Sequence, residues 1–110
     1  MVLDLCRDQH RRIVLAILME QQRAVSLNDL TKDVITYNHH LSITEAPDEV
    51  VDQIYLTLSH IHVPKLVDNR VVTYDRERQL VSPTERLDQL QPYLTTIIEM
   101  DPHLDIAGSD

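Results

Sequence analysis

Apolar residues recur at spacings of three and four along most of the chain, and this period predicts helices with one buried side. The first helix is expected over about residues 7–22, with a core side made by Ile13, Val14, Ile17 and Leu18. The second is expected after Ser26, a typical capping residue, with Asp29 three positions on as an incomplete capping box. Its core side would be Leu27, Leu30, Val34 and Ile35. Residues 37–47 lack a clean period and are expected to form a loop.

The longest apolar pattern covers residues 50–67 and predicts a third helix. On a helical wheel, one side consists of Val51, Ile54, Tyr55, Leu58, His62 and Leu66. The opposite side carries amide, hydroxyl and imidazole groups without a carboxylate, from Gln53, Thr57 and His60, together with Pro64. Proline removes a helical hydrogen bond, so a bend is expected near residues 60–64, after which the helix resumes. Asn69 or Arg70 would form the corner that ends it.

After this corner the pattern changes to that of strands. The segment VVTYD (71–75) is rich in β-branched residues, and QLVS (79–82) matches a returning strand. Between them, Asp75, Arg76, Glu77 and Arg78 suit a tight polar turn. The expected fold class is therefore mainly α with a small β-hairpin, an α+β fold.

The free side of the third helix and the hairpin turn both suggest contact with nucleic acid. Side chains such as Gln53, Thr57 and His60 can hydrogen-bond base edges in a major groove. A solvated side of an ordinary amphipathic helix fits the same wheel. Arg76 and Arg78 can lie beside phosphates, or they can belong to a solvated turn.

The block SHIHVPKLVDNRVVTYD (59–75) resembles the recognition helix and first wing strand of archaeal winged helix-turn-helix regulators. It looks like a haloarchaeal group of small winged-helix domains, mostly of unassigned function. The matching residues are His60, His62, Val63, Pro64, Lys65, Leu66, Val71, Val72, Tyr74 and Asp75. RRIVLAIL and VSLNDLTKDV look like the first two helices of that group, so the resemblance covers about residues 7–84. Arg70 stands where the corner usually has Gly. The resemblance implies a winged helix-turn-helix fold, DNA binding and transcription control.

A last helix is expected from Thr84, which would cap it. Its apolar stripe consists of Leu87, Leu90, Leu94, Ile97 and Ile98, and the spacings of three and four match a coiled-coil seam. Pro92 predicts a kink or a restart. Such a helix either packs on its own core or pairs with the same helix of a second subunit. We favour a homodimer, because two-fold pairing suits palindromic DNA half-sites.

Composition limits the alternatives. With 110 residues the chain suits one compact domain, and its single Gly cannot build a phosphate-cradling loop. The single cysteine, Cys6, excludes an internal disulfide. No apolar run approaches the roughly 18 residues of a membrane span, and no signal peptide is recognisable. We therefore expect a cytoplasmic protein without a membrane partner.

The net charge of −8 opposes simple DNA affinity, which depends on neutralising phosphates. The charge is unevenly distributed, however. Residues 25–64 and 87–110 each carry −5 by residue count, whereas residues 1–24 and 65–86 each carry +1. A halophilic source would also explain an acidic surface, since high salt screens self-repulsion. Near the start, Arg7, Arg11 and Arg12 are interpreted as solvated beside Asp4 and Asp8 rather than as phosphate contacts.

No catalytic or metal chemistry is expected from the spacing of the residues. The six histidines include His60 and His62, which point to different sides of a helix, and the adjacent His39 and His40. Cys6 and His10 share one helix side, but no spacing supplies the three or four ligands of a zinc site. His62 is expected to be a half-buried histidine with satisfied partners. We expect no cofactor, no small-molecule effector and no enzyme activity.

Two functions are compatible with these observations. The first is a homodimeric, sequence-specific regulator that binds double-stranded DNA through Gln53, Thr57, His60, Lys65, Arg76 and Arg78. In it, residues 1–84 form the DNA-binding domain, residues 84–100 the dimerisation helix and residues 101–110 an acidic tail. The second is a protein-interaction module that keeps the winged-helix fold but does not bind DNA, which the acidic charge favours.

Overall fold

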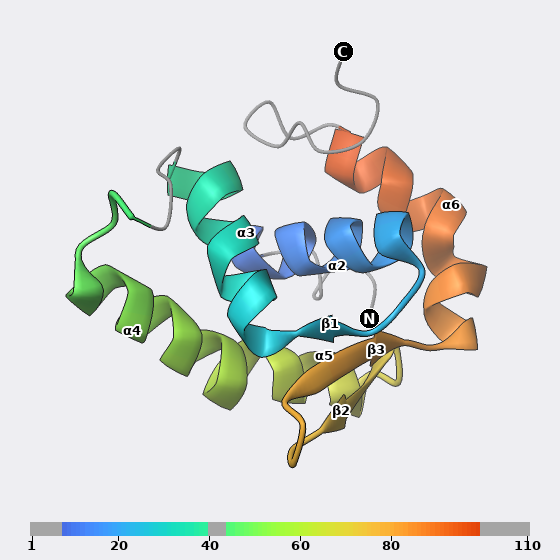
Figure 1. Ribbon diagram of the computed structural model, residues 1–110. Helices are drawn as coiled ribbons and strands as arrows, with labels where there is room; N and C mark the ends of the chain where they lie inside the picture. Colours follow the sequence, from blue (N-terminus) through green and yellow to red (C-terminus); the bar gives the residue numbers. More distant parts are fainter. Residues whose placement is uncertain (1–7, 40–43, 100–110) are drawn as a thin grey trace.

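The computed structural model describes residues 8–39 and 44–99, arranged as Figure 1 shows. Its elements are α2 (Gln9–Gln21), β1 (Val25–Ser26), α3 (Leu27–His39), α4 (Asp48–Thr57), η1 (Leu58–His62), α5 (Val63–Asp68), β2 (Val72–Asp75), β3 (Leu80–Pro83) and α6 (Glu85–Glu99). The fold is mainly helical, with a small three-stranded antiparallel sheet in the order β1-β3-β2. This confirms the predicted α+β class. Strand β1 was not predicted, because two residues are too few to show a strand period in the sequence.

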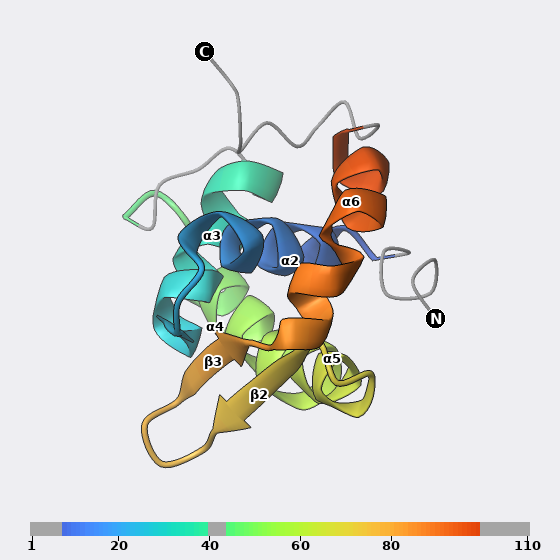
Figure 2. The ribbon, with the colours of Figure 1, turned by 90° about the vertical axis from the view of Figure 1, so that its right-hand side faces the viewer.

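Helix α2 lies at the centre, with α3, α6 and the later helices around it (Figures 1 and 2). Every residue from Ile13 to Met19 is buried, so the helix is covered on more sides than its predicted stripe requires. Each fully buried aliphatic side chain contributes roughly 1.5–3 kcal/mol to stability. Helix α2 is therefore the support against which the other elements are positioned.

Helix α3 begins as predicted and ends later than predicted. The Ser26 hydroxyl accepts a hydrogen bond from the backbone N–H of Asp29 at 3.0 Å, which is the expected cap. The helix continues to His39, so the expectation of a loop from residue 37 is wrong for its first three residues. Tyr37 explains the extension, because its half-buried ring packs against the core. His40 and residues 41–43 lie outside the described residues.

Segments α4, η1 and α5 continue directly into one another without a break and form one rod, residues 48–68, called here the long helix. At the predicted bend the structure has a π-helical turn, in which the N–H of Val63 donates to the carbonyl of Leu58, five residues back. This wider turn lies directly before Pro64, which lacks an N–H and crowds the preceding turn of an α-helix. The extra residue in this turn thus accommodates Pro64 within a continuous helix.

The corner after the long helix lies at Arg70, whose φ of 65° is in the left-handed region. The N–H of Arg70 donates to Val67 and the N–H of Val71 to Leu66, the pair of bonds that ends many helices. Thr84 donates its hydroxyl to the Arg70 carbonyl at 2.7 Å. The start of α6 therefore fixes the corner, although no glycine is present there.

The hairpin agrees with its predicted strands and turn. Strands β2 and β3 pair from Val72 opposite Pro83 to Asp75 opposite Leu80. The Asp75 carboxylate accepts the N–H groups of Glu77 and Arg78 at 3.0 and 3.2 Å, which shapes the turn. The hairpin tip projects from the same side of the molecule as α5 (Figures 1 and 2).

Helix α6 corrects the expectation of a dimer seam. Leu87 and Leu94 are 1% and 0% exposed, and Leu90 and Ile97 are half-buried against the same core. These side chains pack within their own chain, largely against α2, because α2 leaves this side uncovered. The side chain of Ile98 and the tail from residue 100 lie outside the described residues. Helix α6 runs through Pro92 and changes direction near its middle (Figure 1).

Candidate functional site

Two of the concave surfaces along the long helix are lined by predicted site residues. The first, the histidine hollow, has a volume of about 580 Å³ and is lined by Asp8, His10, Arg11, Gln53, Thr57, His62 and three aliphatic residues. The second, the hairpin groove, has a volume of about 650 Å³ and lies between the long helix and the hairpin. Its lining includes Leu56, His60, Pro64, Val67, Tyr74 and Arg76.

The structure divides the six predicted DNA-binding residues between these surfaces. Gln53 and Thr57 line the histidine hollow, whereas His60 and Arg76 line the hairpin groove. Lys65, half-buried, and Arg78, exposed on the hairpin turn, line neither surface.

The π-helical turn explains this division. One extra residue in a turn rotates the later part of the helix by about 100° relative to an uninterrupted α-helix. Ile61 therefore continues the side of Gln53 and Thr57 into the histidine hollow, while His60 lies on the hairpin side. A helical wheel with a constant angle cannot show this rotation. The Thr57 hydroxyl also donates to the Ile54 carbonyl at 3.0 Å, within its own helix.

Exposed carboxylates gather in the N-terminal half of the long helix. Asp48, Glu49 and Asp52 are all exposed in the first two turns, beside Gln53. Further along, Leu56 and Ile61 are 53% and 54% exposed. The three carboxylates do not lie on the predicted polar side: Asp48 and Glu49 precede the wheel, where they favour the helix N-terminus, and Asp52 lines a separate hollow with Asn28 and Lys32.

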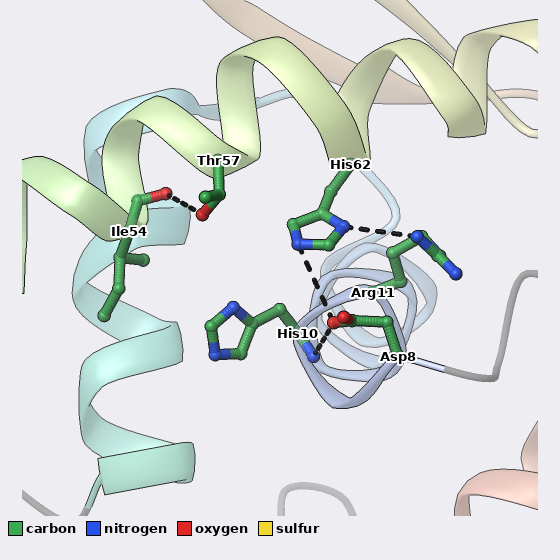
Figure 3. A network of polar contacts seen from close by, with 6 residues as sticks. All are labelled: Asp8, His10, Arg11, Ile54, Thr57 and His62. Atoms are coloured by element: carbon green, nitrogen blue, oxygen red, sulfur yellow. Dashed lines mark hydrogen bonds and ion pairs between the residues drawn. The ribbon is translucent and has the colours of Figure 1, made fainter.

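Beneath the long helix, a polar cluster joins it to the start of α2 (Figure 3). Asp8 caps α2 by accepting the backbone N–H of His10 at 2.8 Å. His62 projects from the π-helical turn between Asp8 and Arg11, and its Nδ1 lies 3.3 Å from Arg11 Nη1. His62 Nε2 lies 3.7 Å from Asp8 Oδ1, and the His10 ring meets the His62 ring edge-on. His62 is thus buried with partners, as predicted.

Burial and charge act on this cluster in opposite directions. Burial lowers the pKa of His62, and Arg11 and His10 lower it further against the opposing effect of Asp8. Burial alone would raise the pKa of Asp8, but His62, the His10 N–H and the nearby cations together hold it below its usual value. The cluster therefore favours a neutral imidazole beside an ionised carboxylate.

Two of these features have no signal in the sequence. Arg11, interpreted as solvated, is only 7% exposed, because its guanidinium reaches the His62 ring from one turn inside α2. Asp8, His10 and His62 offer one metal-ligand atom each, and these three atoms lie within 4.8 Å of one another. Local spacing could not reveal this set, since His62 is more than fifty positions from the other two. In the residues that the structure describes, it is the one such set.

Comparison with known proteins places the chain in a family without assigning it an activity. No curated protein and no solved structure gives a significant match. Within residues 8–39 and 44–99, no helix has the length and apolar character that crossing a membrane requires. Residues 3–82 match the family DUF7344, described as a domain of unknown function. Because this match covers most of the chain, the protein belongs to the DUF7344 family.

Proposed function

We propose that this protein is a DNA-binding transcription regulator with a winged helix-turn-helix fold. The observation that carries the proposal is the hairpin groove, which His60 from the long helix and Arg76 from the hairpin line together. The order of the elements, with β1 before α3, the long helix third and the sheet order β1-β3-β2, supports the resemblance to winged-helix regulators. In this proposal α3 and the long helix are the helix-turn-helix, and β2–β3 is the wing.

The charges of the long helix select which part of it would meet DNA. Asp48, Glu49 and Asp52 would repel phosphates, so the N-terminal half is the poorer contact surface. The C-terminal half carries Lys65 and one carboxylate, Asp68, which offset each other. Arg70 and the exposed Arg76 and Arg78 lie beyond it. We therefore propose that DNA contacts the C-terminal half and the wing, with His60 at a base edge and the arginines at phosphates.

A homodimer remains part of the proposal but needs a surface other than the apolar stripe of α6. The outer side of α6 offers Tyr93, which is 65% exposed. Two-fold symmetry would place two long helices about one turn of DNA apart. Light scattering of the wild-type chain and Tyr93→Ala at several concentrations tests this surface. A monomer at every concentration would contradict the dimer and leave a regulator that binds a single site without an inverted repeat.

The main experiment is selection of bound genomic fragments across a series of salt concentrations, followed by sequencing. The regulator predicts an enriched sequence motif. Arg76→Ala with Arg78→Ala should weaken binding to all sequences alike and reduce the slope of log K against log salt by about 1.8, as expected for two lost phosphate contacts. The charge-matched control is Arg23→Ala with Lys32→Ala, two exposed cations outside the hairpin. Equal effects of both pairs would contradict the wing contact.

A second function has its own supporting observation. Three exposed carboxylates and the exposed Leu56, Ile61 and Val67 on one helix suit a protein partner better than a phosphate backbone. In this function the chain is an interaction module that does not bind DNA. No enriched sequence at any salt concentration, with a folded wild-type chain, would favour this module over the regulator.

A further inference from the structure

We propose that Asp8, His10 and His62 form a binding site for a divalent transition-metal ion of the zinc, cobalt and nickel class. The site would join the N-terminal end of α2 to the π-helical turn of the long helix. The inference that the ion regulates DNA binding rests on the proposed function, whereas the inference that it binds does not.

The donor atoms determine the class of ion. Two imidazole nitrogens and one carboxylate oxygen converge within 4.8 Å. Imidazole suits zinc, nickel and copper-type ions, whereas magnesium and calcium select oxygen ligands alone. Zinc ligands lie at about 2.0–2.2 Å from the ion, so neighbouring donors are about 3.5 Å apart. His62 Nε2 and Asp8 Oδ1 are already 3.7 Å apart, so only a pair as distant as 4.8 Å must close by about 1 Å, which rotation of the His10 side chain on the first turn of α2 can supply.

The surroundings leave room for further ligands. The histidine hollow of about 580 Å³ opens beside the three donors and is also lined by the polar Gln53 and Thr57. A site with three protein ligands keeps at least one position open for water or a small ligand. Asp8 is 41% exposed in its side chain, so an ion can reach the site from solvent.

Arg11 gives this site two mutually exclusive states. A guanidinium can only donate, so its 3.3 Å contact requires His62 Nδ1 to be without a proton. The proton of the neutral ring is then on Nε2, which faces Asp8. A metal ion at Nε2 requires the other tautomer, with the proton on Nδ1 facing Arg11. Two donors cannot share a hydrogen bond, so metal binding releases Arg11 from His62.

This exchange provides the link to regulation. His62 lies in the π-helical turn, two residues after His60, which lines the hairpin groove on the other side. In the metal-free state Arg11 holds the turn through His62 Nδ1, and in the metal-bound state the ion, held by Asp8 and His10, holds it through His62 Nε2. A ligand that favours one of two arrangements shifts the population towards it. The ion would therefore alter the position of His60 relative to the wing.

The binding experiment uses the full chain, freed of metal with a chelator and titrated with Co²⁺ while visible absorption is recorded. The wild-type chain should bind one ion with the spectrum of nitrogen-ligated cobalt, and Zn²⁺ should displace it. His10→Ala and Asp8→Asn should each weaken binding at least tenfold. Asn retains the helix cap, so this variant keeps α2 intact. The matched control is His60→Ala, an exposed histidine of the long helix that lies outside the site and should bind Co²⁺ as the wild type does.

Arg11→Met tests the exclusive states directly. Removing the competing donor should tighten Co²⁺ binding several-fold, whereas weaker binding would overturn the exchange. A wild-type chain without a cobalt spectrum, or equal binding by His10→Ala and His60→Ala, would overturn the site. Once a target DNA is identified, adding Zn²⁺ should change the DNA affinity of the wild type but not that of His10→Ala. Because cobalt binding is measured without DNA, failure of the proposed regulator and failure of the metal site are distinguishable.

Discussion

The two sides of the long helix are hollowed to a similar extent, but by residues of different chemistry. The histidine hollow gathers a carboxylate, a guanidinium and two imidazoles from α2 and the π-helical turn. The hairpin groove gathers Leu56, Pro64, Val67 and Tyr74, with one histidine and one carboxylate from the long helix and one arginine from the wing. The first side is that of the proposed metal site, and the second is the side on which we propose that DNA docks.

The difference arises from a single turn of one helix. Without the extra residue of the π-helical turn, His60 would share a side with Gln53 and Thr57, as the constant-angle wheel predicts. His60 and His62, two positions apart, face different sides of any helix. The π-helical turn decides that His60 faces the hairpin groove and leaves Ile61 on the side of Gln53 and Thr57.

The largest expected effect is a loss of stability from shortening Leu58, the buried residue beneath both surfaces of the long helix. Leu58 is 0% exposed and begins the π-helical turn. Leu58→Ala should lower the free energy of unfolding by about 2–5 kcal/mol, measured by urea denaturation, because it leaves a cavity in the core. Leu56→Ala is the control, since its side chain is 53% exposed and should change stability by no more than about 0.5 kcal/mol. Equal losses would contradict the described packing.

The next effect concerns base preference and tests which side of the long helix contacts DNA. His60→Ala should relax the preference at one base pair by about 1–3 kcal/mol, because it removes a side chain that shares the hairpin groove with Arg76. Thr57→Ala should leave the preference unchanged, since its hydroxyl is bound to the Ile54 carbonyl. Selection and sequencing with each variant measures both. The reverse result would mean that the histidine hollow, rather than the hairpin groove, meets the DNA.

Local features of this fold could be predicted from the sequence, and contacts between distant residues could not. The Ser26 cap, the Arg70 corner and the hairpin turn each depend on a few neighbouring residues. The burial of Arg11 depends on His62, 51 positions away. The fate of the α6 stripe likewise depends on an uncovered side of α2, because an apolar stripe looks the same whether it packs within a chain or between chains.

A smaller effect concerns the corner that sets the angle between the long helix and the wing. Arg70 adopts a φ of 65°, a region that disfavours side chains by roughly 1–2 kcal/mol. Arg70→Gly should therefore raise the free energy of unfolding by about 1 kcal/mol or less, because glycine also adds entropy to the unfolded chain. Asn69→Gly, at a φ of −90°, should lower it instead. Thermal or urea unfolding of the pair decides between these outcomes.

The smallest effect is a pH dependence on the hairpin side. Burial raises the pKa of Tyr74 from 10.0, with Tyr55 and Asp75 adding to the rise and Arg76 opposing it. The folded state then favours the neutral hydroxyl, so this stability is complete below pH 10.0 and is lost as pH rises through the folded pKa. Tyr74→Phe should flatten the alkaline loss of stability by less than about 1 kcal/mol, since the ring is half-exposed. Tyr93→Phe on α6 is the control, and an equal flattening there would contradict the assignment.

The central position of α2 has a consequence for the order in which the protein can be made. Helix α2 leaves the ribosome early, but the leucines that cover it from α6 are among the last described residues to be synthesised. Domains fold as units during synthesis at about 5–20 residues per second. For several seconds this helix, whose residues from Ile13 to Met19 are all buried in the folded protein, therefore lacks part of its covering, and the completed core forms only after α6 has emerged.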